Sequence, residues 1–402
     1  MQIRFFSYFY PPCIGGGEVI LQHQAEGLAA RGHDVHVHTT PFTNLNLAER
    51  VRPGTQVERG VVVHRRRSVA IPFRTPMEKP VWTPAFTADT RLPADLRVAV
   101  GFPSLHLGPV LTAGRRTGGP VIAQNYLTAG FLDEILAGEG GPHKQLRAAL
   151  WRGPVRRQLA ACDLVIADSP LAGRALEDRL GLDNVRVHIG MAVDPAEFAA
   201  VGPAEGAAVR ARLGLGADRI LLAPSRVSRQ KGADLLLDAI GPVLPAGWRV
   251  VIAGPVNEPD FVEGVDRQIA ALGGRAQRTL LPRPELVALM HEADVVCLPS
   301  RGETVGGVVF EGMYAGALVV VSDAVEAAAL DYLQDGVNGL LFPAEDVGAL
   351  RAALLRAMTT ESSEMRRAGR EMVERRFVWS RSVDRLWGLY EEAAARAARR
   401  AR

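Results

Sequence analysis

The chain has 402 residues, of which 48% are hydrophobic and 23% charged, a composition that is ordinary for a globular protein and excludes wholesale disorder. Its length is sufficient for two domains of roughly 150–200 residues each. The formal net charge of +3 is small, and no basic stripe interleaved with aromatic residues occurs, so the sequence does not indicate nucleic-acid binding.

The cysteines and the N-terminus indicate the compartment. Cys13, Cys162 and Cys297 are widely spaced in or beside apolar stretches, which favours reduced thiols over a disulfide framework or a zinc site. Residues 1–8 already have the pattern of a strand, so no signal peptide is expected. No apolar run approaches the roughly 20 residues of a membrane-spanning helix. We therefore expect a cytoplasmic protein. Peripheral contact at the inner membrane face and the oligomeric state are both left open.

The first half of the chain alternates strands and helices. Apolar runs predict strands at 2–8, 34–39, 61–66, 96–101, 120–123, 163–167 and 185–189, and helical spacing predicts helices at 18–30, 146–159 and 171–179. The second of these helices is expected to break or kink at Gly153-Pro154, and the proline-rich stretch 68–95 is expected to be a long excursion loop. This alternation predicts a parallel sheet covered on both faces.

After a weakly patterned stretch at 194–216, interpreted as a linker, a second alternation begins. Strands are predicted at 220–223, 249–253, 278–281, 295–298, 318–322 and 339–342, and helices at 233–240, 261–272, 285–291, from about 305, 347–358, 363–375 and 380–402. The fold class is therefore α/β, with two doubly wound parallel-sheet domains in tandem. Ligands bind outside the carboxyl ends of the strands in such sheets, so a cleft between the domains is the expected site.

The stretch 297–313 combines a buried strand, a glycine-bearing turn and a helix start. Free backbone N–H groups and the helix dipole converge at such a turn and favour a phosphate. Glu303 lies in the turn and Glu311 two turns into the helix. A carboxylate can accept two hydroxyl hydrogen bonds from a ribose diol. The alternative is a pair of ordinary surface acids, although the apolar neighbours of Glu311 argue against simple exposure.

Two further motifs fit a phosphate-bearing ligand. Gly15-Gly16-Gly17 opens the first helix, where glycines let a ligand approach the backbone, although a flexible turn is the alternative. The triplet is not a G-x-G-x-x-G motif, so the dinucleotide fingerprint is absent. Arg226 and Lys231 follow the first strand of the second domain, a place that suits a diphosphate, with a solvated basic turn as the alternative.

The remaining polar residues favour structural interpretations. His36 and His38 alternate along a strand and are expected to be structural. The basic helix that contains Arg152 and Arg156 is expected to be a solvated face in preference to a membrane patch. No metal-binding motif is visible, so neither a protein-held metal nor another cofactor is expected.

Taken together, these residues resemble the retaining glycosyltransferases of family 4, which have the GT-B fold of two Rossmann-like domains facing a central cleft. The resemblance covers nearly the whole chain. It is carried by Pro12 with 15–17 and 28–35, by 162–169, 193–198, Ser225-Arg226 with Lys231-Gly232, the E-x7-E signature within 293–311, and 335–341. It implies an N-terminal acceptor-binding domain at 1–200, a donor-binding domain at 216–378, and a C-terminal helix at 379–402 that crosses back to the first domain.

The resemblance implies a hexosyltransferase that moves a hexose-type sugar from a UDP- or GDP-sugar to a hydroxyl of a small molecule, natural product or glycan. Arg226 and Lys231 would neutralise the departing diphosphate, and Glu303 would contact donor sugar hydroxyls near the reacting carbon; these three would be the catalytic residues. Glu311 would hold the ribose. Retention is described for the family as front-face attack with the donor phosphate as base.

Other donor contacts are implied in the same way. Backbone N–H groups of Val305, Gly306 and Gly307 would bind the donor sugar or its phosphate. Gly16 and Gly17 would let their loop approach the diphosphate. The loop at Pro282 and Arg283 would border the base.

The chain departs from the family at two places. After the strand that begins at Pro120 the family usually has a histidine, whereas this chain has Gln124-Asn125-Tyr126. Tyr126 occupies the counted place and Asn125 is the better hydrogen-bonding substitute, so both are candidates on the acceptor side, where loops 68–95 and 127–141 would shape the pocket. The run at 324–327 replaces the usual Gly-Gly and Pro-Glu.

Two alternative functions stay open. One is an epimerase of the same fold that acts on the nucleotide sugar itself, and the other is a non-catalytic bilobal nucleotide-sugar binder. An NAD oxidoreductase is disfavoured by the missing fingerprint.

Overall fold

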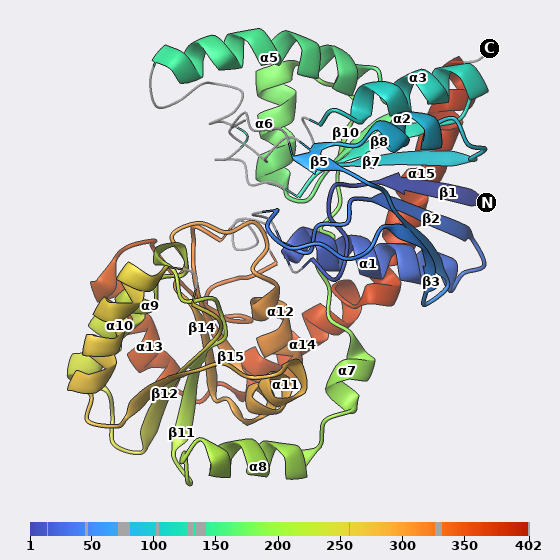
Figure 1. Ribbon diagram of the computed structural model, residues 1–402. Helices are drawn as coiled ribbons and strands as arrows, with labels where there is room; N and C mark the ends of the chain where they lie inside the picture. Colours follow the sequence, from blue (N-terminus) through green and yellow to red (C-terminus); the bar gives the residue numbers. More distant parts are fainter. Residues whose placement is uncertain are drawn as a thin grey trace. The chain divides into compact units, whose positions relative to one another are not determined.

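The computed structural model of the protein describes residues 1–13, 15–44, 47–70, 81–101, 104–126, 132, 142–256, 258–325 and 332–400. The chain divides into two compact units. Unit 1 comprises Met1–Met191 and Trp379–Arg402, and unit 2 comprises Ala192–Val378. Each unit is a sheet with helices packed against it (Figure 1).

Unit 1 is built on an 8-stranded sheet with the order β10-β9-β8-β7-β1-β2-β4-β3. Its strands are β1 (Gln2–Phe6), β2 (Asp34–Thr39), β3 (Gly54–Glu58), β4 (Val61–Arg65), β7 (Leu96–Val100), β8 (Val121–Gln124), β9 (Leu164–Ala167) and β10 (Val185–Val187). The strands pair in parallel except for β3 with β4. Strands β7, β8 and β9 are buried along their whole length, as parallel strands covered on both faces require.

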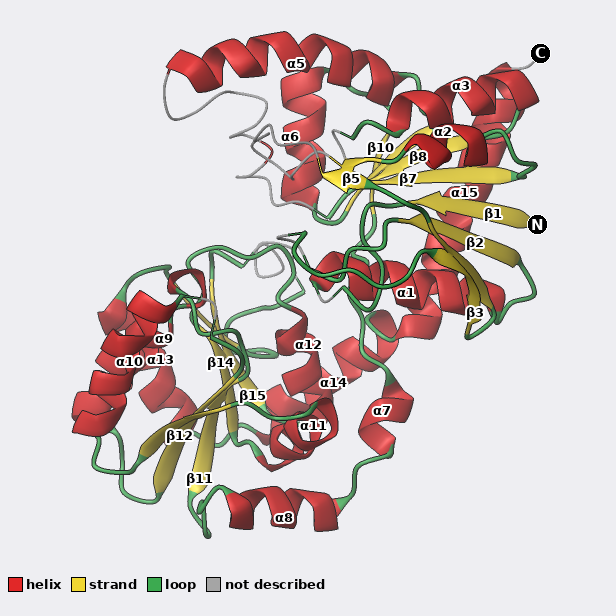
Figure 2. Cartoon of the chain, in the orientation of Figure 1, coloured by secondary structure: helices red, strands yellow, loops and turns green. Residues whose placement is uncertain are grey.

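Helices cover both faces of this sheet (Figure 2). They are α1 (Gly16–Ala29) and α15 (Trp379–Arg400) on one face, and α2 (Pro84–Asp89), α3 (Leu107–Thr117), α5 (Pro142–Ala160) and α6 (Pro170–Leu180) on the other. Ile3 and Phe5 of β1 pack with Leu386 of α15, whereas Phe6 faces the opposite core. A separate two-stranded sheet pairs β5 (Val69–Ala70) with β6 (Val81–Trp82).

Unit 2 contains a 6-stranded, fully parallel sheet with the order β13-β12-β11-β14-β15-β16. Its strands are β11 (Arg219–Ala223), β12 (Trp248–Ala253), β13 (Ala276–Thr279), β14 (Val295–Leu298), β15 (Leu318–Ser322) and β16 (Leu340–Phe342). Its helices are α7 (Pro195–Ala199), α8 (Pro203–Arg212), α9 (Ala233–Ile240), α10 (Pro259–Ala271), α11 (Arg283–Glu292), α12 (Gly307–Ala315), α13 (Val347–Thr359) and α14 (Ser363–Arg376), with short 3-10 turns at η1 (Arg229–Lys231) and η2 (Gly241–Val243). Helices α9, α10 and α13 lie on one side of this sheet, and α11, α12 and α14 on the other (Figure 1).

The predicted fold class of two parallel α/β sheets is confirmed. The stretch 194–216, interpreted as a linker because of its weak pattern, contains the two helices α7 and α8. Each of these helices has a proline at its first residue, where the missing N–H costs nothing. The Asp194 carboxylate caps α7 by accepting from the Ala196 N–H at 3.0 Å. Prolines that read as helix breakers thus mark helix starts.

Some expectations for unit 1 differ from the structure. The excursion 68–95 is not all loop, since its described part contains β5, β6 and α2; residues 71–80 of it, and nearly all of loop 127–141, lie outside the described residues. The helix predicted at 146–159 is not broken, because α5 runs continuously through the exposed Pro154. The hairpin strand β3 and helix α3 were not predicted. In α3, Gly114 lowers the helical signal, but a side chain there would overlap Val121 of the sheet.

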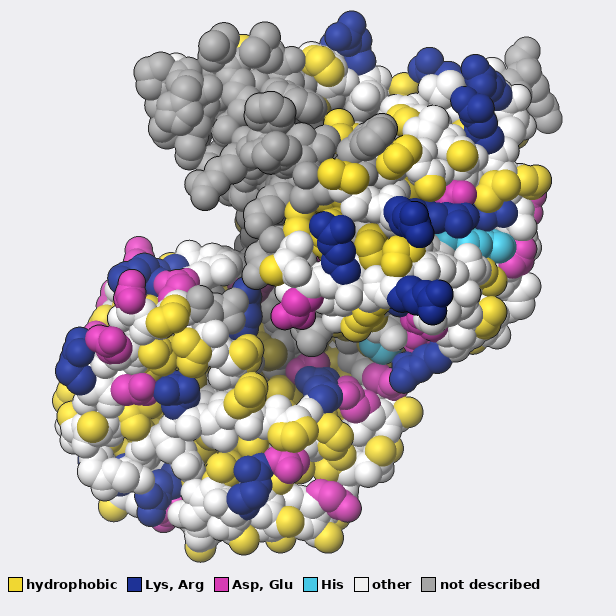
Figure 3. Space-filling view, viewed as in Figure 1, with side chains coloured by type: hydrophobic (Ala, Val, Ile, Leu, Met, Phe, Trp, Pro, Cys, Tyr) yellow, Lys and Arg dark blue, Asp and Glu magenta, His cyan; other side chains and the backbone are white. Residues whose placement is uncertain are grey.

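The surface agrees with the small net charge. On the face of unit 2 shown in Figure 3, basic and acidic side chains are interspersed and do not gather by sign. Within the described residues, every helix is too short or too polar to cross a bilayer.

Candidate functional site

The carboxyl ends of neighbouring strands bring the sequence-predicted residues of unit 2 together. Arg226 and Lys231 follow β11, and Glu303 follows β14. These two strands are adjacent in the sheet, with Leu221 opposite Val295. Parallel strands end at the same edge, so the two loops emerge side by side.

Hydrogen bonds hold these two loops together. The Arg301 guanidinium donates to both carboxylate oxygens of Asp234, at 3.0 and 2.8 Å. The Arg301 backbone N–H donates to the Gln230 carbonyl at 2.8 Å, and the Gln230 side-chain amide donates to the Gly302 carbonyl at 2.8 Å. The turn that contains Lys231 is thereby fixed against the loop that contains Glu303.

Lys231 and Glu303 form an ion pair across these loops, and their side chains are only 11% and 18% exposed. Gly232, which follows Lys231, has φ 71°, and a side chain there would overlap the Pro299 carbonyl oxygen. Only glycine allows this approach. Burial, together with the nearby charge of Arg226, lowers the pKa of Lys231 to about 8, while the ion pair with Glu303 acts in the opposite direction.

The turn after Glu303 leads into the first residue of α12. Gly306 is the N-cap residue with φ 61°, and an added Cβ would lie 2.7 Å from Leu298 Cδ2. Val305 is buried, and Gly307 is the first helical residue. The Thr304 N–H donates to Glu303 Oε1 at 3.3 Å. The first-turn N–H groups and the helix dipole make this turn suitable for an anion.

Glu311 has a charged partner that the sequence did not predict. Arg283, the first residue of α11, donates from Nη1 to Glu311 Oε2 at 3.0 Å and from Nη2 to Oε1 at 2.7 Å. It also donates from Nε and Nη2 to the Glu197 carboxylate of α7, at 2.8 and 2.7 Å. Burial acts to lower the pKa of Arg283, but these hydrogen bonds outweigh burial and raise it. The partners lie 86 and 28 residues from Arg283, so local sequence spacing carries no signal for the contact.

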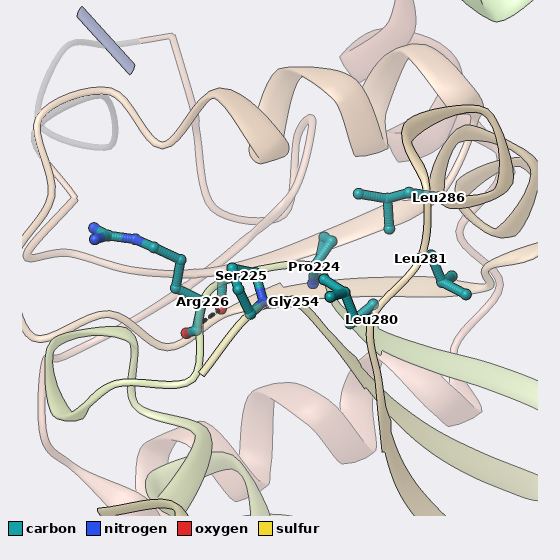
Figure 4. A pocket seen from close by; sticks show the side chains of 9 residues that line it. Pro224, Ser225, Arg226, Gly254, Leu280, Leu281 and Leu286 are labelled. Atoms are coloured by element: carbon teal, nitrogen blue, oxygen red, sulfur yellow. Dashed lines mark hydrogen bonds between the residues drawn. The ribbon is translucent and has the colours of Figure 1, made fainter. Parts of the chain in front are cut away.

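A pocket of about 180 Å³ opens at the carboxyl ends of β11, β12 and β13 (Figure 4). It is lined by Pro224, Ser225, Arg226, Ala253, Gly254, Pro255, Leu280, Leu281 and Leu286. The leucines give it an apolar wall that suits a planar ring, and the Arg226 guanidinium extends away from them (Figure 4). Pro282 directly follows Leu281 as the N-cap of α11. Arg283 does not line this pocket; its guanidinium is held by Glu197 and Glu311.

In unit 1, Gly16 and Gly17 open α1, and Asn125 and Tyr126 follow β8. A Cβ on Gly17 would lie 2.9 Å from the Tyr126 ring, so this glycine makes room for the tyrosine. The Tyr126 hydroxyl donates to Gln24 Oε1 at 3.2 Å, which directs it into the protein interior, and burial raises its pKa well above the ordinary value. Asn125 is 3% exposed, and its Nδ2 has no hydrogen-bond partner in the described part of the chain.

The histidines of β2 belong to a partly buried polar network in unit 1. His38 Nδ1 lies 2.9 Å from Asp89 Oδ2, and His36 Nδ1 lies 2.9 Å from His64 Nε2. Among the described residues, no group of three or more His, Cys, Asp or Glu side chains could hold a metal ion.

Two basic side chains of α5 have structural partners. Arg152 donates from Nε to the Arg179 carbonyl at 2.9 Å, and Arg156 donates to the Leu180 carbonyl at 2.7 Å. Both carbonyls lie at the C-terminal end of α6, where cations are favourable. These arginines therefore cap a neighbouring helix.

Comparison with known proteins gives two family matches. Residues 14–190 match Glycosyltransferase Family 4, and residues 218–360 match Glycosyl transferases group 1. Among curated relatives, the D-inositol 3-phosphate glycosyltransferase of Acidothermus cellulolyticus is 28% identical, over 95% of this chain and 86% of the relative. The phosphatidyl-myo-inositol mannosyltransferase of Mycobacterium leprae is 29% identical over 94% of each chain.

Solved structures with the same fold include Anabaena HepE in complex with UDP, with a TM-score of 0.73, 20% identity and coverage of 96% of this chain and 99% of that chain. Sucrose-phosphate synthase from Thermosynechococcus elongatus also has a TM-score of 0.73 and 20% identity, covering 98% of this chain and 99% of that chain. The fold and the family matches define a GT-B enzyme that transfers sugar from a nucleotide sugar. The chain belongs to the group 1 or family 4 glycosyltransferases, which confirms the resemblance found in the sequence.

Proposed function

We propose that the enzyme transfers a hexose from a UDP- or GDP-sugar to a hydroxyl acceptor with retention of the anomeric configuration. Unit 2 binds the donor, and unit 1 binds the acceptor. One observation carries the proposal: two cation–carboxylate pairs, Lys231 with Glu303 and Arg283 with Glu311, lie at the carboxyl edge of one sheet together with an apolar pocket.

Each part of a nucleotide sugar has a matching group at this edge. The pocket with Leu280, Leu281 and Leu286 receives the base. Glu311 accepts a hydrogen bond from a ribose hydroxyl group. The diphosphate meets the cations of Arg226 and Lys231 and the N–H groups of Val305, Gly306 and Gly307 at the start of α12. Glu303 accepts hydrogen bonds from the donor sugar hydroxyls.

The chemistry is stabilisation of a leaving group. Glycosyl transfer passes through an oxocarbenium-like state in which negative charge grows on the departing diphosphate. Lys231, Arg226 and the dipole of α12 favour that charge before the reaction begins. Glu303 is paired with the Lys231 ammonium group, so it acts as an acceptor that orients the sugar and not as a proton donor. Retention follows from front-face attack with the donor phosphate as base, the description given for the family.

Unit 1 offers polar groups for the acceptor. The buried Asn125 amide at the carboxyl end of β8 has an Nδ2 without a partner in the described residues, which supports a polar ligand group there. The Tyr126 hydroxyl is engaged by Gln24, so Asn125 is the better candidate. Because relatives that span 94–95% of this chain are named for inositol-based acceptors, cyclitols and their phosphates come first in an acceptor panel.

A donor panel scored by thermal shift identifies the nucleotide sugar, since a ligand at 100 times its Kd stabilises the folded protein by about 2.7 kcal/mol. Release of nucleoside diphosphate is then measured with and without each acceptor, and the anomeric proton of the product is observed by NMR. Release that requires acceptor, with a retained anomeric configuration, supports the proposal. An inverted product contradicts retention, formation of an epimer identifies an epimerase, and binding without turnover identifies a binder. Unchanged turnover in Lys231→Ala and Glu311→Ala contradicts the site.

A further inference from the structure

Arg283 connects three helices of unit 2 through one side chain. It stands at the start of α11, which packs against α7, α8 and α12. One edge of its guanidinium, with Nε and Nη2, binds Glu197 of α7, and the other edge, with Nη1 and Nη2, binds Glu311 of α12. The Arg283 side chain is 40% exposed, whereas Glu311 is only 15% exposed. Of the three side chains in these two ion pairs, the proposed ribose ligand Glu311 is therefore the least exposed to solvent.

The Arg283 contact leaves Glu311 able to bind a ribose hydroxyl group. A carboxylate has about four acceptor positions, two on each oxygen. Arg283 uses one position on Oε1 and one on Oε2. One position on each oxygen stays available, and because these two positions lie on opposite sides of the carboxylate, a ribose can use one of them through a single hydroxyl group. Arg283 thus fixes the plane and rotation of the Glu311 carboxylate without blocking ribose.

Glu197 gives Arg283 its own orientation. The guanidinium has five N–H groups, of which Glu197 and Glu311 engage four in two bidentate contacts. A guanidinium held on two edges cannot rotate about its side chain. Lysine has no planar fork and cannot reproduce both contacts.

We propose that Arg283 is a positioning residue for nucleotide selection, and that Glu197 fixes Arg283, so that Glu311 is preorganised to distinguish a ribose from a 2′-deoxyribose. This inference rests on the proposed function, in which Glu311 is the ribose ligand. A site built to accept a hydroxyl hydrogen bond rejects an analogue without that hydroxyl, because its buried acceptor is left unpaired. Selectivity for the ribonucleotide is greatest when the Glu311 carboxylate cannot rotate to accept a hydrogen bond from water in place of the missing hydroxyl.

The test compares the Kd of UDP with that of 2′-deoxyuridine 5′-diphosphate by calorimetry, or the guanosine pair if the donor panel selects GDP. Wild type, Glu311→Gln, Arg283→Gln, Arg283→Lys and Glu197→Gln are titrated, and circular dichroism and Tm establish that each is folded. Arg278→Gln is the matched control, since Arg278 also forms a bidentate ion pair, with Asp266 at 3.0 Å for both contacts, and stands in β13 two residues before Leu280 of the pocket.

We expect wild type and Arg278→Gln to prefer UDP by about tenfold or more. Glu311→Gln reduces this preference to about one, and Arg283→Gln, Arg283→Lys and Glu197→Gln reduce it at least about threefold. Arg283→Lys decides the question if Arg283→Gln does not fold.

The outcomes separate the two proposals. A preference that survives Glu311→Gln overturns the ribose assignment itself. A preference lost in Glu311→Gln but kept in both Arg283 variants overturns the positioning role alone. An equal fall in affinity for both nucleotides in the Arg283 variants shows a purely structural ion pair and also overturns it. Wild-type preference in Glu197→Gln removes Glu197 from the inference.

Discussion

Lys231 holds its positive charge in surroundings that are largely shielded from water, which makes its charge sensitive to pH. Its pKa is lowered to about 8 by burial and by the nearby Arg226. In the proposed function, the diphosphate binds the protonated form of Lys231. As pH rises through about 8 the free enzyme loses this charge, so we predict that the Kd for UDP or GDP increases between pH 7 and pH 9. Calorimetry across this range measures the effect.

Lys231→Arg is the matched variant for this prediction. An arginine stays protonated over the whole range, so its Kd should vary much less with pH than that of wild type. Equal pH dependence in both proteins would show that another group titrates.

The two carboxylates of the E-x7-E signature should separate kinetically. Glu303 pairs with Lys231 beside the proposed sugar, and Glu311 pairs with Arg283 at the proposed ribose. We predict that Glu303→Gln lowers kcat by about a hundredfold, the size of loss seen when one transition-state contact is removed, with little change in Kd for the nucleoside diphosphate. Glu311→Gln should mainly raise that Kd. Steady-state kinetics and calorimetry on both variants measure the two effects, and identical profiles would refute separate roles.

At the scale of elements, the site depends on the close approach of the β11 and β14 loops. Gly232→Ala puts a Cβ against the Pro299 carbonyl at φ 71°, and the backbone conformation alone costs about 1–3 kcal/mol. We predict a lower urea midpoint for this variant and weaker binding of the nucleoside diphosphate.

Gly302→Ala controls for Gly232→Ala, because Gly302 lies in the β14 loop that Gly232 of the β11 loop approaches, and a Cβ added to Gly302 has open space around it. Its urea midpoint should stay close to that of wild type. Equal losses in both variants would mean that neither loop tolerates an alanine, and that the contact with Pro299 is not the cause.

The sequence predicted the elements best where burial dictates the pattern. The strands at 34–39, 295–298 and 318–322 and the helix at 233–240 have the bounds that were expected, because continuous apolar or amphipathic runs leave no other way to bury their side chains. Helix α7 was missed because it has only 5 residues, and α8 because its sequence has few large apolar residues and so gives little helical periodicity.

The candidate site was predictable only in part. Lys231 and Glu303 lie in the loops that follow two neighbouring strands of the sheet. Because the carboxyl ends of parallel strands bind ligands, the order of strands and loops in the sequence is enough to predict such residues. The contacts of Arg283 with Glu197 and Glu311 depend on how α7, α11 and α12 pack, and packing of side chains across helices has no signature in local spacing. The pocket wall likewise needs three separate strand ends.

At the scale of the whole molecule, unit 1 should be the acid-labile part. Burial lowers the pKa of His36 and His38, and lowers that of His64 to about 4, although the Asp89 carboxylate beside His38 opposes the shift. Protonation therefore favours the unfolded chain, whose histidines titrate near 6.5. Stability contributed by these neutral histidines is present above about pH 6.5 and is lost as pH falls toward about 4.

Hydrogen exchange followed by mass spectrometry locates this effect. We predict that lowering the pH from 7 to 4.5, with exchange corrected for its intrinsic pH dependence, reduces protection in β2 and β4 before it does so in β11 and β14. His64→Gln, which cannot take up a proton, should lessen the difference. Earlier loss of protection in unit 2 would contradict the prediction.

The most direct measurement is a calorimetric titration of the nucleoside diphosphate selected by the donor panel into wild type, Lys231→Gln and Glu311→Gln. A donor site at the carboxyl edge of the unit 2 sheet predicts one binding site per chain, with affinity at least about tenfold weaker in each variant, since each loses a hydrogen bond to a charged group. Wild-type affinity in both folded variants would contradict the assignment of this edge as the donor site.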